Sequence, residues 1–424
     1  MDMRIALASY GTRGDVEPTV AVGVELLRRG NEIRIAVPPD LMEFAAAAGL
    51  APVEYGPGIQ DQLGRYRDLW TQWAGRFWRI DELWRACAGA SRIVTNQWSE
   101  MDATLRSLAD GVDVLSTSVG YQDVAANVAE YYDIPLVAIH TFPWRANGQL
   151  FPRIPAPLVR LGMKTYDWAA WAVTMSAGNT QRRDLGLPKV FGPSPRRIAE
   201  RGALEIQAYD SACFPGLASE WGGWVERRPF VGTLTMELKT EADNEVSEWL
   251  AEGNPPICFC FGSIPVESPD ETLRIVDGAC AELGERGLVC AAGTDFGDVS
   301  DYRNVKVVGA VNYATTFVKC RAVVHHGGAG TTAAVLRAGV PSFVLWSVGD
   351  QPFWGAQLTH LKVGASRPLS KVDRTSLVAG LRTVLAPDYA LRAREIALRM
   401  TKSSDSVTMA ADLIEKFANT RHIA

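Results

Sequence analysis

Two adjacent histidines and three glycines stand together in the segment VVHHGGAGTT, at residues 323–332. The apolar residues before them predict a strand, and the residues after them predict a helix. Free N–H groups and partial positive charge at a helix start bind anions, and glycines let a phosphate approach the backbone closely. Thr331 and Thr332 add hydroxyl donors, and a histidine at the strand end can donate to a phosphate oxygen or carry charge toward it. The segment therefore predicts a phosphate site; the alternative is a tight turn with a core histidine.

Two well-known nucleotide-binding motifs do not match this segment. No lysine follows the glycines, as a P-loop requires, and the glycine spacing is not GxGxxG. The strand that follows, VPSFVLWS at 340–347, does not end in the acid that would hold an NAD ribose. GTRGD at 11–15 is not GxGxxG either. These mismatches disfavour an NAD-dependent oxidoreductase, which stays the less favoured alternative.

Two acidic residues follow other predicted strands. Asp15 belongs to GTRGD, directly after the first apolar run, and Asp350 stands beside Gln351 after the strand at 340–347. A carboxylate and a neighbouring amide can bind vicinal hydroxyls with directional hydrogen bonds. For both aspartates the alternative is a helix N-cap.

The order of apolar runs predicts an α/β fold. Short apolar runs alternate with segments of helical spacing from the N terminus to residue 139, and again from residue 255. Strands that alternate with helices in this way form doubly wound parallel sheets, so we expect two α/β domains in tandem. We place an N-terminal domain at 1–232, a linker at 233–250, a second domain at 251–404, and a C-terminal helix at 405–424 that can fold back on the first domain.

Composition limits the class of protein. A chain of 424 residues with a formal net charge of −5 is long enough for two or three domains and has no basic footprint for nucleic acid. Its seven cysteines are scattered and never in CxxC spacing, which favours a reduced cytosolic chain over a disulfide framework or a zinc site. The N terminus does not resemble a signal peptide, and no apolar run approaches about 18 residues. We therefore expect a cytoplasmic protein without a membrane-spanning helix.

Four separated motifs resemble those of bacterial family-one glycosyltransferases of the GT-B fold. In chain order they are YGTRGDVEP at 10–18, FGS at 261–263, VHHGGAGTT at 324–332 and WSVGDQPFWG at 346–355. The most similar branches are the sterol glucosyltransferase-like, glycopeptide-antibiotic and mycobacterial glycopeptidolipid glycosyltransferases. The resemblance covers essentially the whole chain. It implies two facing Rossmann-like domains with parallel sheets and an interdomain cleft, with the acceptor in the first domain and a nucleotide-diphosphate sugar in the second.

The resemblance also implies roles for individual residues. It implies a donor-diphosphate site at His325, Gly328, Gly330 and Thr331. Thr12 and Arg13 are expected to reach the same diphosphate, because an arginine suits phosphate geometry. Asp350 and Gln351 match the family's acid–amide pair for the sugar hydroxyls, and Ser263, Val311 and Asn312 are expected near the nucleoside. Many relatives carry Pro-Gln or Pro-His around 312–314, where this chain has NYA. No role is assigned to His326.

Asp15 is the expected general base of a single displacement that inverts the anomeric centre. Many relatives have a histidine at this place, whereas the sterol and antibiotic branches have an aspartate. An ordinary aspartate has a pKa of about 3.9 and is a weak base at neutral pH. Its environment, or the oxocarbenium character of the sugar, must therefore help.

Aromatic residues gather in the first half of the chain, where ten of the 13 tryptophans precede residue 235. Trp70, Trp73 and Phe77 fall on one stripe of a predicted helix, a pattern that is more often core than binding surface. In the resembling family this region shapes the acceptor pocket, so we expect an apolar acceptor site there that also includes His140 and Trp144. A buried structural histidine is the alternative for His140.

The predicted function is therefore an inverting hexosyltransferase that moves a hexose or 6-deoxyhexose from a UDP- or dTDP-sugar to a hydroxyl of an apolar acceptor. The acceptor would be a glycopeptidolipid, glycolipid, sterol or polyketide-like molecule, and we expect neither a bound cofactor nor a metal. A lipid acceptor would require contact with the inner face of the membrane, for which the segment 160–173 is the candidate. A sugar-nucleotide epimerase of the same fold is the nearest alternative. A non-catalytic sugar-nucleotide-binding protein would be expected to lose Asp15 or the glycine turn.

Overall fold

The computed structural model describes residues 3–59, 95, 97–237, 240, 242–262, 268–291, 294–297, 302–347 and 349–421. Within these residues the elements of the first half are β1 (Arg4–Ala8), α1 (Arg13–Arg28), β2 (Glu32–Val37), α2 (Met42–Ala47), β3 (Pro52–Glu54), β4 (Val114–Ser118), α5 (Gln122–Tyr132), β5 (Leu136–His140), α6 (Ala156–Asp184), α7 (Ser194–Glu200), β6 (Leu204–Gln207) and α8 (Leu217–Glu220). Those of the second half are α9 (Asp243–Ala251), β7 (Ile257–Cys260), α10 (Pro269–Leu283), β8 (Gly287–Cys290), β9 (Val305–Val308), α11 (Tyr313–Thr316), β10 (Ala322–His325), α12 (Ala329–Ala338), β11 (Ser342–Trp346), α13 (Gln351–His360), β12 (Gly364–Pro368), α14 (Arg374–Val384), α15 (Pro387–Ala397) and α16 (Ser403–Arg421).

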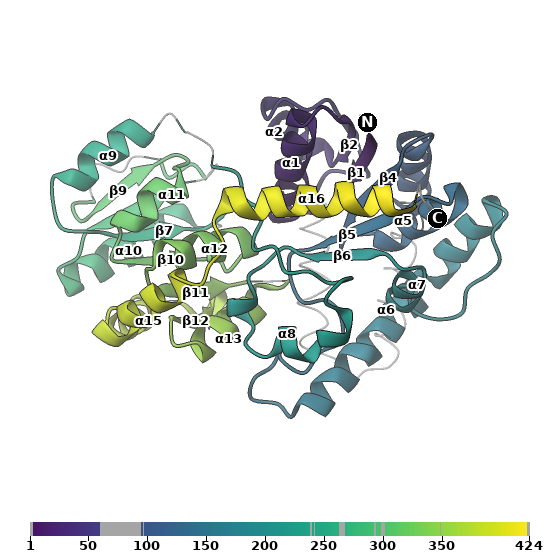
Figure 1. Ribbon diagram of the computed structural model, residues 1–424. Coiled ribbons are helices and arrows are strands. Elements are labelled where there is room, and N and C mark those ends of the chain that lie inside the picture. Colours follow the sequence, from purple (N-terminus) through teal and green to yellow (C-terminus); the bar gives the residue numbers. More distant parts are fainter. Residues whose placement is uncertain are drawn as a thin grey trace.

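The strands form two separate six-stranded sheets, and neighbouring strands in each sheet are parallel (Figure 1). The first sheet has the order β3-β2-β1-β4-β5-β6, and the second has the order β12-β11-β10-β7-β8-β9. Counted from its own first strand, the second sheet repeats the order of the first. This arrangement confirms the predicted α/β fold with two Rossmann-like parallel sheets.

Both faces of each sheet are covered, as the near-continuous apolar strands require. Along β1, Ile5 and Leu7 pack into one core, whereas Ala6 and Ala8 pack into the core on the opposite face. The strand β7 alternates in the same way between two cores of the second sheet. Each sheet is therefore a rigid platform whose loops emerge only at the strand ends.

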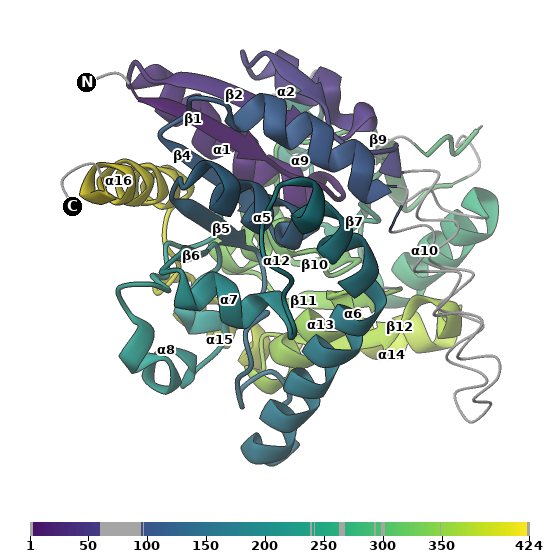
Figure 2. The ribbon, with the colours of Figure 1, turned by 90° about the vertical axis from the view of Figure 1, so that its right-hand side faces the viewer.

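The last helix, α16, runs from the second sheet back to the first and packs beside α1 (Figures 1 and 2). Its residues Ala410, Ala411 and Ile414 belong to the core that contains β1. Arg29, directly after α1, donates to Asp412 and Glu415 at 2.7 Å each. The final helix therefore ties the two halves of the chain together.

The stretch expected as a linker, 233–250, contains most of α9. Val246 and Leu250 of this helix are buried in a core of the second sheet. The residues before it contact α12, because Arg337 donates to the Thr233 carbonyl at 2.6 Å and to the Thr235 hydroxyl at 2.8 Å. The first half of the chain holds the same stretch, because the N–H of Met236 donates to Glu17 of α1 at 2.9 Å. The described residues of the connection are thus held by both halves of the chain.

Aromatic side chains from the two halves meet in a shared core. The ring of Phe142 lies 5.4 Å from that of Phe353, and the ring of Phe214 lies 5.2 Å from that of Trp354. These residues precede or follow loops at the strand ends of both sheets. The cluster therefore holds the two sets of loops against each other.

Candidate active site

The order of strands reverses direction between β1 and β4 in the first sheet and between β7 and β10 in the second. In parallel α/β sheets, ligands bind beside such switch points, beyond the carboxyl ends of the strands. GTRGD follows β1, and the His-Gly turn follows β10. The two segments with the strongest chemical signal in the sequence thus stand at the two places where the fold binds ligands.

Two glycines of the turn after β10, Gly327 and Gly330, lack a side chain for different reasons. Gly327 has φ +94°, and a Cβ there would come within 2.7 Å of Val344 Cγ1, so the fold itself requires glycine. Gly330 lies in the first turn of α12, where a Cβ would meet nothing closer than Thr235 Cγ2 at 3.8 Å. Glycine in a helix costs about 1 kcal/mol relative to alanine. The packing of the protein itself does not require a glycine at position 330. A ligand that lies close to the backbone would require one.

The N terminus of α12 has no side-chain cap, so its first N–H groups stay available to a ligand. Thr331 is buried at this terminus, and the buried hydroxyl of Thr332 has no hydrogen-bond partner among the described residues. The helix start combines free backbone donors with adjacent hydroxyls, as an anion site requires.

His325 ends β10 and is fully buried. The N–H of Gly327 donates to His325 Nδ1 at 3.2 Å, which assigns the ring proton to Nε2. Nε2 is buried and has no partner among the described residues. Burial lowers the pKa of His325 to about 3, so the ring is neutral at physiological pH. His325 can therefore donate a hydrogen bond to an anion, but in the unliganded protein it does not carry charge.

Asp15 lies in the first turn of α1, where its carboxylate folds back on the loop. Oδ2 accepts from the Thr12 N–H at 2.9 Å and from the Thr12 hydroxyl at 3.2 Å. A Cβ at Gly11 would lie 2.2 Å from Oδ2, so only a glycine at position 11 leaves room for the Asp15 carboxylate. Burial raises the pKa of Asp15 to about 6, against the lowering effect of the Thr12 hydrogen bonds. Asp15 therefore caps its helix and is also much more basic than an ordinary aspartate.

Asp350 stands directly before α13, but its carboxylate does not cap the helix. Instead, Oδ2 accepts from the indole N–H of Trp354 at 3.1 Å. Burial raises the pKa of Asp350 to about 7, and the negative charge of Asp15 acts in the same direction. The carboxylates of the two halves are therefore close enough for their charges to interact.

Gln351 is buried beside Asp350. Its Oε1 accepts from the N–H of Ser347 at 2.8 Å, which fixes the side-chain amide against the loop after β11. Gln351 also forms the wall of the glycine turn, because a Cβ at Gly327 would lie 3.2 Å from its carbonyl oxygen. The acid–amide pair and the glycine turn therefore belong to one site.

Arg13 is exposed and contacts its own domain. Its Nε donates to Glu17 at 3.0 Å, and its guanidinium lies 4.6 Å from the ring centre of Phe44. Its positive charge also acts on Tyr313 of the second half, where it opposes the rise in pKa that burial causes. Arg13 therefore lies near the interdomain site, with its guanidinium paired to Glu17.

The predicted nucleoside residues are only partly described. Ser263 lies outside the described residues. Val311 is buried, and Asn312 caps α11 by accepting from the Ala314 N–H at 2.9 Å. The backbone N–H of Asn312 donates to Asp243 at 2.9 Å. The side chain of Asn312 is thus engaged locally, in the loop after β9.

Of the predicted acceptor residues, Trp70, Trp73 and Phe77 lie outside the described residues. His140 ends β5 and is completely buried, with Nδ1 3.5 Å from the amide nitrogen of Gln207. Burial lowers the pKa of His140 to about 3. This environment fits the structural alternative for His140.

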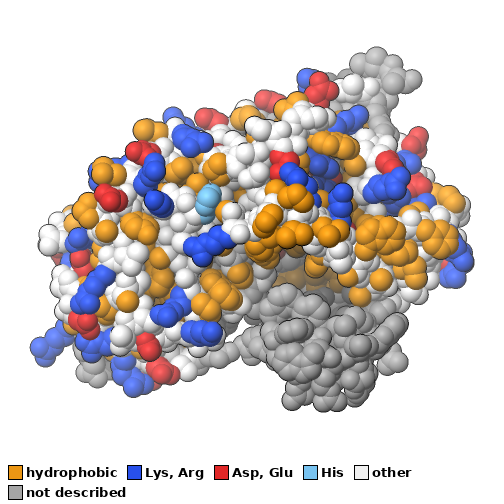
Figure 3. Space-filling view, turned by 90° about the horizontal axis from the view of Figure 1, so that it is seen from below, with side chains coloured by type: hydrophobic (Ala, Val, Ile, Leu, Met, Phe, Trp, Pro, Cys, Tyr) orange, Lys and Arg blue, Asp and Glu red, His pale blue; other side chains and the backbone are white. Residues whose placement is uncertain are grey.

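Trp144 is partly exposed and connects the domain junction to the long helix α6. Its ring lies 5.9 Å from Phe142 and 6.3 Å from Tyr166 of α6. The side of the molecule that carries α6 shows a band of hydrophobic side chains (Figure 3). Exposed apolar residues of this helix are Leu158, Leu161, Tyr166, Trp168 and Met175. None of the helices that the structure describes has the length and apolarity needed to cross a membrane.

Trp354, which donates a hydrogen bond to Asp350, is not among the residues predicted from the sequence. The available signal was the spacing of four between an acid and an indole N–H, which places the two on one helical face. The sequence also gave no sign that Trp354 would be almost completely buried at the junction of the two halves.

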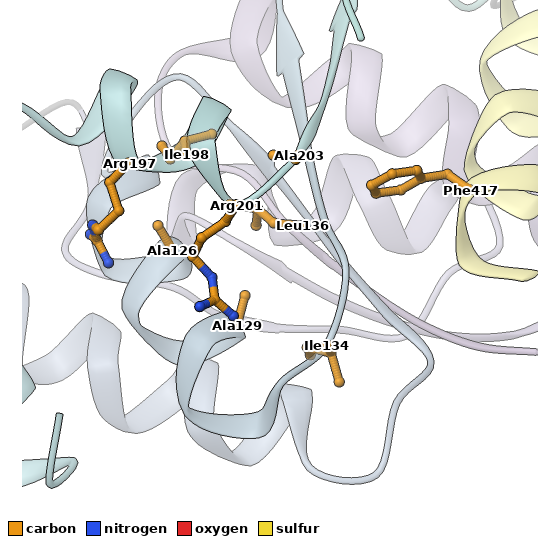
Figure 4. A pocket seen from close by; sticks show the side chains of 10 residues that line it. Ala126, Ala129, Ile134, Leu136, Arg197, Ile198, Arg201, Ala203 and Phe417 are labelled. Carbon is orange, nitrogen blue, oxygen red and sulfur yellow. The ribbon is translucent and has the colours of Figure 1, made fainter. Parts of the chain in front are cut away.

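Two other features lie apart from this site. A cavity of about 20 Å³, room for about one water, is lined by Ala126, Leu136, Ile198 and Phe417 (Figure 4). The thiols of Cys258, Cys260 and Cys290 lie within 4.8 Å of one another inside an apolar core of the second sheet. We assign no role to either feature.

Comparisons with known proteins agree with the geometry. Residues 5–150 match the glycosyltransferase family 28 N-terminal domain, and residues 289–416 match the erythromycin biosynthesis protein CIII-like C-terminal domain. The chain is 52% identical to the uncharacterized glycosyltransferase Rv1524 of Mycobacterium tuberculosis, over 98% of this chain and 99% of the relative. This chain is a glycosyltransferase of the GT-B type.

More distant proteins share the whole architecture of this glycosyltransferase. The vancomycin aglycone glucosyltransferase of Amycolatopsis orientalis is 28% identical over 97% of both chains. The crystal structure of the glycosyltransferase VinC in complex with DTDP has a TM-score of 0.63 and 18% identity, and covers 99% of this chain and 100% of its own. The similarity to VinC shows the fold alone.

Proposed function

We propose that this glycosyltransferase moves a hexose or 6-deoxyhexose from a UDP- or dTDP-sugar to a hydroxyl of an apolar acceptor, with inversion at the anomeric carbon. The acceptor oxygen forms a bond to the anomeric carbon while the bond from that carbon to the diphosphate oxygen breaks. The electron pair leaves with the nucleoside diphosphate, and the acceptor proton goes to Asp15. The observation that carries the proposal is the pairing of a basic carboxylate at one switch point with a bare helix N terminus at the other.

The leaving diphosphate would lie on the turn after β10. Gly328, Gly330 and Thr331 present backbone and hydroxyl donors, and His325 presents Nε2–H without needing a positive charge. Donors that are already oriented stabilise developing negative charge without reorganisation. Thr12 stays a candidate through its loop position, whereas Arg13 would have to leave Glu17 to reach the phosphates.

Asp15 would act as the general base. Its Oδ1 accepts no hydrogen bond from any residue that the structure describes, while Oδ2 is held by Thr12. The raised pKa brings it closer to the neutral range in which a base works best. The helix-capping role and the catalytic role are therefore compatible, since they use different oxygens.

The donor sugar would be bound by Asp350 and Gln351, and its nucleoside would lie near Ser263, Val311 and Asn312. An ionised carboxylate offers both oxygens as acceptors to sugar hydroxyls. The hydrogen bond from Trp354 lowers the pKa of Asp350 against the effect of burial and so favours the ionised form. The presence of DTDP in VinC supports a dTDP-sugar as the donor, alongside UDP-sugars.

The apolar acceptor would lie in the first domain, near Trp70, Trp73, Phe77 and Trp144, with His140 beneath it as a structural residue. The exposed apolar side chains of α6 continue from Trp144 through Tyr166. We propose that this helix meets the lipid surface when the acceptor is a membrane lipid, which would place the enzyme at the cytoplasmic face of the membrane.

We also propose that the domain boundaries lie at residues 232, 250 and 404, with α16 packed against the first domain.

A donor panel tests the reaction. The protein is incubated with UDP- and dTDP-hexoses and 6-deoxyhexoses, with lipopeptide, sterol or polyketide acceptors. Mass spectrometry detects the products, and NMR spectroscopy assigns their anomeric configuration and any epimerised sugar nucleotide. Transfer of one sugar mass with the opposite anomeric configuration is expected. Conversion of the sugar nucleotide without any acceptor would instead support the epimerase alternative.

Flotation with liposomes tests the membrane contact. Vesicles with and without anionic lipid are mixed with the wild type and with a Leu158→Ser, Leu161→Ser double variant. Loss of flotation in the variant is expected, and a wild type that does not float with either vesicle would contradict the contact.

A further inference from the structure

His326, the second histidine of the turn, lies between two loops of the second switch point. A Cβ at Gly262 would lie 2.6 Å from His326 Cε1, and a Cβ at Gly328 would lie 2.4 Å from His326 Nε2. Real Cβ atoms do not approach other atoms so closely. The imidazole therefore lies directly against bare backbone on both sides.

The register of the sheet explains why these two loops are neighbours. The last residue of β10, His325, pairs with the last residue of β7, Cys260, in a parallel ladder. His326 and Phe261 therefore leave the sheet side by side. The His326 ring occupies the space between Gly262 and Gly328.

The backbone angles show that Gly262 is favoured by its backbone conformation, whereas Gly328 is not. Gly262 has φ +75°, a conformation that favours glycine whatever its surroundings. Gly328 has φ −64° and ψ 145°, which any residue adopts. Among the described residues, the atoms nearest to a Cβ at Gly328 all belong to the His326 ring. The pairing of a large ring at 326 with a bare position at 328 is therefore a matter of packing.

The His326 ring is held by its packing against Gly262 and Gly328, and it carries no charge. Burial lowers the pKa of His326 to about 4, so the imidazole is neutral at physiological pH. A hydrogen bond with the backbone of Cys260 acts on the pKa in the opposite direction. Nδ1 has no hydrogen-bond partner among the described residues. A neutral ring that is packed against Gly262 and Gly328 can act as a spacer.

We propose that His326 is a positioning residue that sets the separation between the Gly262 loop and the glycine turn, and thereby the width of the site for the nucleoside diphosphate. The inference rests on the proposed function, because it takes the donor to span both loops. His325 would donate to the phosphates directly, whereas His326 would act through the backbone on either side of it. The two adjacent histidines thus have different tasks.

The packing is tested first, without any ligand, by a double-mutant cycle on thermal unfolding. In the wild-type background Gly328→Ala overlaps the ring and should lower the unfolding midpoint by several degrees. In a His326→Ala background the overlap is gone, so the same substitution should lower the midpoint by less than half as much. Equal effects in both backgrounds would overturn the spacing argument.

Donor binding is then measured by calorimetry with UDP and dTDP. His326→Ala should weaken the tighter of the two at least tenfold, and His326→Gln, which reaches as far as Nε2, should restore affinity to within about threefold. His360→Ala, at an exposed histidine on α13, is the matched control and should bind as the wild type does. Wild-type affinity in His326→Ala, or a His326→Gln variant as weak as His326→Ala, would overturn the proposal.

The two measurements separate this inference from the proposed function. If the wild type bound neither nucleoside diphosphate, the proposed function would fail and the donor role of His326 with it. The unfolding cycle would still show whether the ring spaces the two loops.

Discussion

At the switch point of the first sheet, the loop after β1 carries a carboxylate, and Tyr10 of that loop lies against Gly120 after β4, where a Cβ would meet the Tyr10 carbonyl at 2.5 Å. At the switch point of the second sheet, His326 after β10 lies against Gly262 after β7. At both switch points a residue of one loop thus lies against a glycine of the facing loop, through its backbone carbonyl at Tyr10 and through its ring at His326. The acid is present in one and replaced by free backbone donors in the other.

This difference teaches that strand order decides where the loops meet, and that a few loop residues decide what the loops do. The first switch point offers Asp15, a proton acceptor with a raised pKa. The second offers His325 and the N terminus of α12, which are neutral donors. A group transfer that releases an acceptor proton and a diphosphate needs one of each.

The largest effect is expected from Asp15→Asn, which removes the proposed base but keeps an oxygen that can accept the hydrogen bond from Thr12. Folding stability should therefore stay within about 1 kcal/mol. Turnover should fall by about 10²–10⁴-fold, because only the carboxylate takes the proton. Steady-state kinetics with a donor and an acceptor from the panel measure this.

Asp373→Asn is the matched control, since Asp373 caps α14 by accepting from the Ser376 N–H at 2.8 Å. It should leave turnover unchanged. Near-normal turnover in Asp15→Asn would contradict the assignment of Asp15 as the base.

The second test fills the bare backbone of the other switch point. Gly330→Ala has room in the unliganded protein and should raise stability by about 0.5–1 kcal/mol. Affinity for the nucleoside diphosphate should fall at least tenfold, because the methyl group would occupy the place of a phosphate oxygen. Denaturant unfolding and calorimetry on one preparation give both values.

Gly162→Ala controls for the general effect of removing a helical glycine. Gly162 lies in α6, and a Cβ there would contact nothing within 4 Å. It should stabilise the protein to a similar degree without any change in donor affinity. Unchanged affinity in Gly330→Ala as well would show that no phosphate lies on that backbone.

The third test uses pH to ask whether Asp350 binds the sugar. Its pKa is raised to about 7, so the carboxylate is ionised above that pH and protonated below it. Affinity for the sugar nucleotide should fall up to about tenfold for each pH unit below 7, while affinity for the nucleoside diphosphate alone should change much less. Calorimetry between pH 5.5 and 8 measures both affinities. In an Asp350→Asn variant, the two affinities should change with pH to the same small extent.

The smallest expected effect concerns stability. The pKa of Asp350 is higher in the folded protein than the ordinary value of about 3.9, so the folded state binds more protons and loses stability as pH rises from about 4 to 7. Asp350→Asn removes this loss. Its unfolding midpoint should exceed that of the wild type by a few degrees at pH 8 and match it near pH 4. If the unfolding midpoint of Asp350→Asn exceeded that of the wild type equally at pH 4 and pH 8, this would argue against a raised pKa of Asp350.

Much of the fold followed from local pattern. Apolar runs and helical spacing predicted two parallel α/β sheets, because buried parallel strands need continuous apolar residues and their crossovers need helices. The glycine turn at 327–330, and the acids at 15 and 350, were found as candidates for the same reason: each directly follows a strand. The positions of Ser263, Trp70, Trp73 and Phe77 stay predictions.

The local pattern did not decide which contacts the side chains near the strand ends make. It did not show that Arg13 is paired with Glu17 or that Asn312 caps its own helix, and it left open whether His140 is buried. Each of these outcomes depends on which side chain or backbone group lies within about 3 Å, and sequence spacing does not reveal that for a loop.

The sequence by itself determined which residues stand at strand ends, since alternation of strand and helix is encoded by neighbouring side chains. Only the tertiary structure decided what those residues are like chemically. Asp15 and Asp350 are 335 positions apart, yet they share one region, where burial raises the pKa of both and the charge of one raises the pKa of the other. Burial and charge act through space, so the pKa of such an aspartate depends on groups that only folding brings close to it.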